Sequence, residues 1–291
     1  MTIVLFQDLG FVINHQKSEL LPWQSMTFLG FLIDSQLASP SLTTPKISKI
    51  KKELRKVLRR DRISLRQLAR LVGLLSLSIQ VIFPGPLHYW APLCLKAHYL
   101  RRSLKYSELV FLTEEVRMEL QWWLDHMEAW NGRAIFGASP DLVINSDSSC
   151  HGWGARCGDI SFGGRWTPQE LDMHINCLAL LAGSFAIKSL TQDRISCVVL
   201  LRMDNVSAVQ YINGLGGTRS KALAELAKDF WHFCLENQIS VTVEYLPGSQ
   251  NTLADWNSRF LSDSSDWQLD PAIFRALIER WGPCSVDLFA S

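Results

Sequence analysis

The spacing of hydrophobic and polar positions gives the first part of the chain short strands followed by long helices. Residues 1–40 mix short apolar runs with turn residues, and we predict strands at 9–13 and within 26–34. Pro45 then opens an amphipathic helix, because apolar residues recur every three or four positions after it. Ser64 is the predicted N-cap of a second amphipathic helix. Further helical patterns cover 91–101 and 112–129.

From about residue 140 the pattern changes to strands that alternate with helices. The expected order is β-β-β-α-β-α-α-β-α, which favours an α/β fold with a mixed sheet and helices on both faces. The predicted strands are 141–147, 151–157, 160–166, 196–202 and 239–245, and the predicted helices are 175–190, 205–213, 220–236 and 251–260.

The small net charge of +1 hides an uneven distribution. Up to Ile135 there are 18 Lys and Arg against 11 Asp and Glu, whereas from Phe136 onward there are 11 against 17. The helix that starts at Pro45 carries much of the positive charge, and a basic helix of this kind is typical of contacts to nucleic-acid phosphates. A solvated helix face is the alternative interpretation. The candidate nucleic-acid-binding residues are Lys46, Lys49, Lys52, Arg55, Lys56 and Arg59.

The cysteines and the length of the apolar stretches indicate where in the cell the protein is expected. Seven cysteines are scattered without a Cys-x-x-Cys pair, which argues against a disulfide framework or a zinc site. We therefore expect an intracellular protein, in the nucleus or the cytoplasm. No apolar stretch reaches the ~18 residues of a membrane helix, so a membrane is not an expected partner.

Three aspartates lie where carboxylates of an α/β nuclease hold metal ions. Asp147 ends a predicted strand, Asp204 follows another, and Asp255 lies in a predicted helix. Taken singly, Asp204 could cap a helix, Asp147 could be a turn residue and Asp255 could be an exposed helical residue. In this order on this pattern, they together predict a site for Mg²⁺ or Mn²⁺.

The strings around these aspartates resemble the ribonuclease H domain of a retroelement reverse transcriptase, most closely that of the DIRS-type retrotransposons, which encode a tyrosine recombinase. The resemblance implies a ribonuclease H-like five-stranded mixed sheet. The matching strings are Asp147-Ser-Ser-Cys-His-Gly-Trp-Gly-Ala, His174-Ile-Asn-Cys-Leu-Ala, Arg202-Met-Asp-Asn and Leu246-Pro-Gly-Ser-Gln-Asn-Thr-Leu-Ala-Asp255.

The resemblance extends over essentially the whole chain and implies four parts. Leu9-Gly-Phe-Val-Ile-Asn and Phe28-Leu-Gly-Phe resemble the late palm of the polymerase. The polymerase's catalytic aspartates have no counterpart here, so polymerase activity is not expected. The implied parts are a palm remnant with primer-grip-like strands at 1–44, a helical thumb- and connection-like region at 45–135, a ribonuclease H-like domain at 138–262 and a C-terminal helix and linker at 263–291.

Two departures from the family pattern concern catalysis. Ala179 stands where the family has a metal-binding Glu, and Tyr245 stands where it has a His that assists proton transfer or product release. A tyrosine, with a pKa near 10, replaces that His poorly at neutral pH. The two-ion site is therefore expected to be incomplete.

The implied ancestral reaction is Mg²⁺-dependent endonucleolytic hydrolysis of the RNA strand of RNA–DNA hybrids, and we expect it to be impaired. The expected partner is nucleic acid, as a hybrid or a duplex, without a small-molecule cofactor. Two alternatives stay open from the sequence: a catalytically inactive nucleic-acid-binding module, and a decayed transposon fragment.

Overall fold

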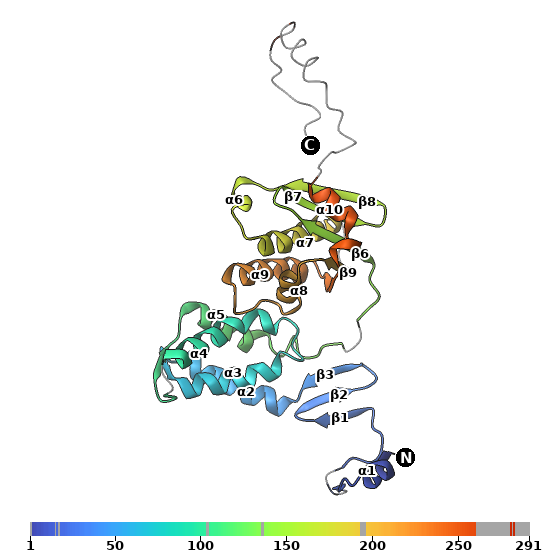
Figure 1. Ribbon diagram of the computed structural model, residues 1–291. Coiled ribbons are helices and arrows are strands. Elements are labelled where there is room, and N and C mark those ends of the chain that lie inside the picture. Colours follow the sequence, from blue (N-terminus) through green and yellow to red (C-terminus); the bar gives the residue numbers. More distant parts are fainter. Residues whose placement is uncertain are drawn as a thin grey trace. The chain divides into compact units, whose positions relative to one another are not determined.

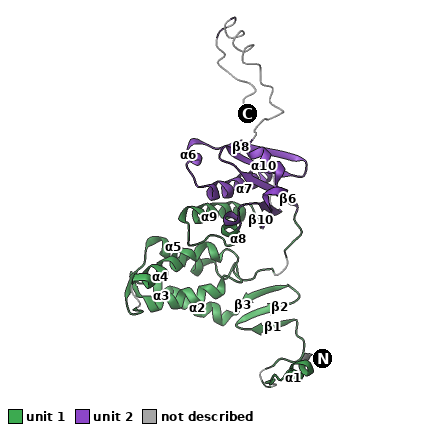
Figure 2. Ribbon diagram, in the orientation of Figure 1, with its two compact units in different colours: residues 1–140, 210–239 green, residues 141–209, 240–291 purple. Residues whose placement is uncertain are grey.

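The computed structural model describes residues 2–14, 16, 18–102, 105–134, 137–192, 196–259, 280 and 282. The chain forms two compact units (Figures 1 and 2). Unit 1 contains residues 1–140 and 210–239, and unit 2 contains 141–209 and 240–291. Almost all of the predicted C-terminal helix and linker lies outside the described residues. The four predicted domain boundaries stay predictions.

Unit 1 begins with a helix, and the strand expected at 9–13 is absent. Helix α1 (Thr2–Asp8) is followed by a turn at Gly10, whose φ of 85° only glycine adopts easily. The Phe11 N–H donates to the Phe6 carbonyl, and the two rings pack edge to face 5.6 Å apart. This is a Schellman ending, in which the residue after the glycine packs back on the helix. It prevents residues 9–13 from pairing as a strand, so that prediction is wrong.

A small antiparallel sheet follows α1. It consists of β1 (Ser25–Phe28), β2 (Phe31–Asp34) and β3 (Ser39–Leu42) in that order. The turn between β1 and β2 consists of Leu29 and Gly30, both with positive φ, as a tight two-residue hairpin turn requires. The run predicted as strand within 26–34 is therefore a complete hairpin.

The helical part of unit 1 follows the predicted periodicity closely. Its helices are α2 (Thr44–Leu58), α3 (Leu65–Ser78), α4 (Trp90–Arg102) and α5 (Glu114–His126), with the 3-10 helix η2 (Gly85–His88) between α3 and α4. Ser64 caps α3 as expected, and Gln67 completes a capping box. Short strands β4 (Arg62–Ser64) and β5 (Leu109–Phe111) pair antiparallel beside α3.

Residues 210–239 contribute the last part of unit 1. They contain the second half of α8 (Val206–Asn213) and all of α9 (Lys221–Glu236). The Trp90 indole N–H donates to the Leu215 carbonyl at 2.9 Å, and Trp231 packs edge to face on Phe83. The predicted helices 205–213 and 220–236 are thus present, but α9 belongs to the same unit as α4 and α5.

Unit 2 is built on a five-stranded mixed sheet. Strands β9 and β10 run parallel to β6, whereas β7 and β8 form an antiparallel meander with it. The sheet order is β10-β9-β6-β7-β8. Its elements are β6 (Leu142–Ser148), β7 (Gly152–Cys157), β8 (Ile160–Arg165), α6 (Pro168–Leu171), α7 (Ile175–Thr191), β9 (Val198–Met203), β10 (Ser240–Tyr245), η3 (Gly248–Gln250) and α10 (Thr252–Arg259).

Helices α7 and α10 cover opposite faces of this sheet. A Cβ on Gly183 of α7 would lie 2.7 Å from the Met203 side chain. A Cβ on Gly154 of β7 would lie 2.5 Å from backbone atoms of α10. Met203 pairs with Ser146 and Gly154 pairs with Asp147, and neighbouring residues of a strand point to opposite faces. The predicted α/β class, with a mixed five-stranded sheet and helices on both faces, is confirmed.

Within the described ranges, no helix combines the length and the apolar character that crossing a membrane requires.

Candidate functional site

The sheet brings Asp147 and Asp204 to the same edge. Strand β6 pairs with β9 as far as Ser146 and Met203, and each aspartate is the residue that follows this pair. Strand β6 lies between a parallel neighbour, β9, and an antiparallel neighbour, β7. In open α/β sheets, ligands bind outside the carboxyl ends of the parallel strands. Two of the three predicted aspartates therefore lie where a ligand site is expected.

Asp147 is buried, with 7% of its surface exposed. Its Oδ2 accepts a hydrogen bond from the Ser258 hydroxyl at 3.0 Å. Burial, and then the negative charge of Asp204, raise the pKa of Asp147 to about 7, with a smaller contribution from Asp255 and against the lowering effect of the Ser258 hydrogen bond. Three carboxylates therefore influence one another in this region, and the Arg259 guanidinium, which pairs with Asp255, also interacts with the charge of Asp147.

Helix α10 positions Asp255. The Asn251 amide N–H just before the helix donates to the Ser146 carbonyl at 2.9 Å, which fixes the start of α10 beside Asp147. One turn further, the Asp255 carboxylate accepts from the Arg259 guanidinium at 2.7 Å. The first turn of a helix suits an acidic side chain. The carboxylate of Asp255 is thus held at the site but already paired with a cation.

Ala179 lies on α7 between two residues that contact the aspartate edge. One turn before it, the Asn176 side chain accepts from the Asn205 amide at 2.9 Å, and Asn205 directly follows Asp204. One turn after it, Gly183 faces Ser146, the residue before Asp147. Residues four apart share a helix face, so Ala179 faces the same edge of the sheet. It is 5% exposed and carries no donor or charge.

Tyr245 ends β10 opposite Met203 and is half exposed. The following Leu246 N–H donates to the Met203 carbonyl at 2.9 Å, so the loop after β10 stays beside Asp204. A Cβ on Gly248 would lie 3.3 Å from the Asp204 Oδ2. The residue at the position of the family's His therefore lies at the rim of the aspartate site.

The donor set fits a divalent cation only in part. Its ligands are carboxylate oxygens, which Mg²⁺ prefers, and the buried side-chain oxygens of Asn145, Ser146 and Asn251 have no hydrogen-bond partner. However, no three acidic, histidine or cysteine side chains of the described residues lie together as a metal-binding group. With Asp255 paired to Arg259, the residues do not fit a two-ion site.

Helix α2 presents the predicted basic residues in two different environments. Lys46 lies over the Phe31 ring, with its ammonium 4.1 Å from the ring centroid. Burial, and then the charge of Lys49, lower the pKa of Lys46. The ammonium of Lys56 is paired with Glu53 at 2.9 Å. The exposed members are Lys49, Lys52, Arg55, Lys56 and Arg59.

Four site residues were missed from the sequence: Asn205, Asn251, Ser258 and Arg259. Asn251, Asp255 and Ser258 recur at helical spacing, and this periodicity was the available signal. Hydrogen bonds that link α10 to β6 or α7 to the end of β9 join residues more than 25 positions apart. No local pattern predicts them.

Neither a protein-family model nor a curated protein matches this chain. Among solved structures, LC11-RNase H1 in complex with an RNA/DNA hybrid is 17% identical, over 40% of this chain and 91% of that chain, with a TM-score of 0.35. The N-terminal RNase H domain of rv2228c from Mycobacterium tuberculosis, fused to maltose-binding protein, is 18% identical, over 42% and 95%, with a TM-score of 0.32.

A third similar structure is a foamy viral protease-reverse transcriptase in complex with double-stranded DNA. It is 15% identical over 84% of this chain, with a TM-score of 0.34. The match covers only 41% of the foamy viral chain. All of these TM-scores lie below 0.5, so they add no weight to the sheet order and the site described above.

Proposed function

We propose that this protein is a ribonuclease H-type module that binds nucleic acid and hydrolyses it weakly or not at all. The proposed ligand is an RNA–DNA hybrid or a duplex. The ancestral reaction is Mg²⁺-dependent endonucleolytic cleavage of the RNA strand. The DIRS-type retrotransposon origin belongs to the same proposal and rests on the sequence strings around the aspartates.

One observation carries this proposal: buried Ala179 faces the edge of the sheet where Asp147 and Asp204 lie. Asp147 already has a raised pKa because it is buried and because Asp204 adds negative charge beside it. A divalent cation bound there would balance this charge and could activate water. With an alanine in place of a fourth carboxylate, the residues hold such a cation weakly, and hydrolysis is impaired.

Helix α2 supports the binding half of the proposal. Its exposed cations outnumber the acidic groups within reach, since Glu53 pairs with Lys56. Each Lys or Arg that neutralises a phosphate releases counterions, which makes affinity depend on salt. A catalytically silent protein of this kind would still bind a hybrid.

The test of the catalytic half is cleavage of an end-labelled RNA–DNA hybrid with Mg²⁺ or Mn²⁺. We expect the natural protein to cut weakly or not at all. The cleavage rate of Ala179→Glu should be at least ~10-fold higher, because losses around a metal site cost ~10–100-fold in activity. Asp204→Asn in the Ala179→Glu background is the control and should abolish the gain. Efficient cutting by the natural protein that is lost in Asp204→Asn would contradict the impairment.

The binding half is tested by the salt dependence of hybrid affinity. Lys52→Gln should lower the slope of log K against log salt by ~0.9, whereas Arg219→Gln, an equal change of charge on another exposed residue, should leave it unchanged. Equal slopes for both variants and the natural protein would show that α2 is a solvated face. Absence of hybrid binding would refute this half.

A further inference from the structure

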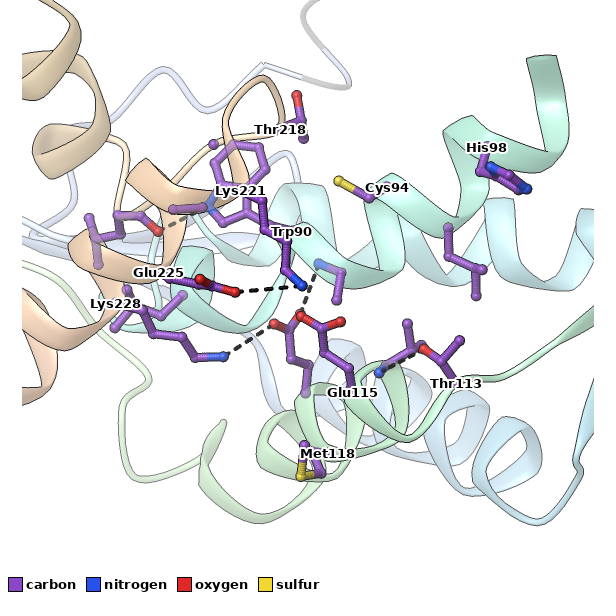
Figure 3. A pocket seen from close by; sticks show the side chains of 18 residues that line it. Trp90, Cys94, His98, Thr113, Glu115, Met118, Thr218, Lys221, Glu225 and Lys228 are labelled. Carbon is purple, nitrogen blue, oxygen red and sulfur yellow. Dashed lines mark hydrogen bonds and ion pairs between the residues drawn. The ribbon is translucent and has the colours of Figure 1, made fainter. Parts of the chain in front are cut away.

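Unit 1 contains a cavity of about 650 Å³ that the proposed function does not use. It lies between α4, α5 and the segment from Leu215 to Lys228 (Figure 3). Its volume is within the range of small-molecule sites, and such sites combine apolar walls with a few polar groups. The apolar walls include Leu87, Trp90, Leu95, Val116, Met118 and Leu215.

Three carboxylates line this cavity: Glu115 and Glu119 of α5, and Glu225 of α9. Glu115 and Glu119 lie four residues apart, an arrangement in which like charges repel. Glu119 is 5% exposed and accepts from the Ala91 N–H at 3.1 Å. A buried carboxylate such as Glu119 is unfavourable in its charged form unless a cation lies beside it.

The two lysines of the lining are already paired. Lys228 lies 3.5 Å from Glu119, and Lys221 lies 3.6 Å from Glu225. Glu115 has no ion pair among the described residues, so the lining keeps one negative charge in excess. In Figure 3, the side chains of Trp90, Glu115 and Lys228 converge on the same space from three elements.

The remaining features of the lining fix the orientation of an occupant. The Trp90 N–H is used by the Leu215 carbonyl, so the indole offers the cavity only carbon surface. Aromatic carbon and the Met118 thioether favour flat or apolar groups and cations over anions. An excess carboxylate also repels phosphates, so a nucleic-acid backbone is a poor occupant.

We propose that this cavity binds a small amphipathic cation, an amine carried on an apolar or aromatic body. The ammonium lies between Glu115 and Glu119, and the body lies against Trp90 and Val116. The site is independent of the aspartate edge in unit 2 and of hybrid binding.

The test is calorimetric titration of the full chain at pH 8 with three indoles that share a ring and differ in charge. These are tryptamine, the neutral alcohol tryptophol and indole-3-propionate. We expect tryptamine to bind with a Kd below ~1 mM, tryptophol several-fold more weakly and the anion not measurably. Equal affinity of the amine and the alcohol, or absence of tryptamine binding, overturns the proposal.

Matched variants locate the site. Glu115→Gln should weaken tryptamine binding by ~3-fold, as for an exposed ion pair, while Glu114→Gln on the same helix turn but outside the lining should leave it unchanged. Glu119→Gln should weaken it by ~10-fold or more, because a desolvated charge is lost. Ala224→Phe should block binding by filling the cavity.

Glu115 and Glu114 are exposed, so their variants should fold even if Glu119→Gln does not. If Glu114→Gln and Glu115→Gln weaken binding equally, the ammonium does not lie in this cavity and the proposal fails. Hybrid cleavage and hybrid binding are measured separately, so either proposal can fail without the other.

Discussion

Replacement of Glu119 by glutamine should stabilise unit 1 at alkaline pH and leave it unchanged in acid. Burial raises the pKa of Glu119 from 4.5 to about 7, although Lys228 and the Ala91 N–H act in the opposite direction. Below pH 4.5 the carboxyl is protonated in both the folded and the unfolded chain. Between pH 4.5 and 7 the unfolded chain loses this proton while the folded chain keeps it, so stability falls as pH rises.

The size of the effect follows from the same interval. At ~1.4 kcal/mol per pH unit, the interval from 4.5 to about 7 corresponds to at most ~3–4 kcal/mol. Glutamine cannot ionise, and its amide oxygen can still accept from the Ala91 N–H. The advantage of Glu119→Gln over the natural protein should therefore be less than ~1 kcal/mol at pH 5 and approach ~3 kcal/mol at pH 8.

Two measurements check this reasoning. The Ala91 amide resonance should titrate with a midpoint near 7, because its N–H donates to Glu119. Urea denaturation at pH 5 and pH 8, with hydrogen exchange of the buried α5 amides as the local readout, gives the free-energy difference. Lys228→Met is the control: without this cation the midpoint should rise. A midpoint near 4.5, or an equal effect of Glu119→Gln at both pH values, would refute the argument.

Three stability predictions concern single positions, each measured as the change in free energy of unfolding. Gly154→Ala should destabilise unit 2 by ~1–3 kcal/mol, because its Cβ would lie 2.5 Å from the backbone of α10. Gly73→Ala should stabilise α3 by ~0.5–1 kcal/mol, since nothing lies within 4 Å of the added Cβ. Ser64→Ala should cost about 1 kcal/mol through loss of the hydroxyl that caps the Gln67 N–H. A stabilising Gly154→Ala, a destabilising Gly73→Ala or a neutral Ser64→Ala would each contradict the contact named.

The periodicity of apolar residues predicted helices and strands well where only one face of the element is buried. In α2, Ile47, Ile50, Leu54 and Val57 are buried as their spacing indicated, and each strand of the five-stranded sheet begins within two residues of its predicted start. The strand predicted at 9–13 failed because Gly10 was not interpreted as a helix ending. The sequence signal was present, but an apolar run of that length suits a strand equally well.

The sequence predicted which residues form the aspartate site. It did not predict the hydrogen bonds and ion pairs between them. Asp147 and Asp204 follow apolar strands, and parallel strands bring such residues to one edge. The Ser258 hydroxyl on Asp147 joins positions 111 residues apart, and no local rule predicts it. The cavity depends in the same way on Lys228 meeting Glu119 across 109 residues.

Unit 1 needs residues 210–239, which are synthesised after most of unit 2, so its folding cannot be completed early in translation. Helices α2 to α5 leave the ribosome before α9 is made, and the indole of Trp90 then lacks the Leu215 carbonyl, which is 125 residues further along the chain. Phe83 likewise lacks Trp231. The apolar surface of α2 to α5 that α9 covers therefore stays exposed during synthesis. It stays so until the first four strands of unit 2, which precede α9 in the sequence, have been translated. We expect folding to be slow and chaperone-dependent, because contacts of such long sequence separation form last.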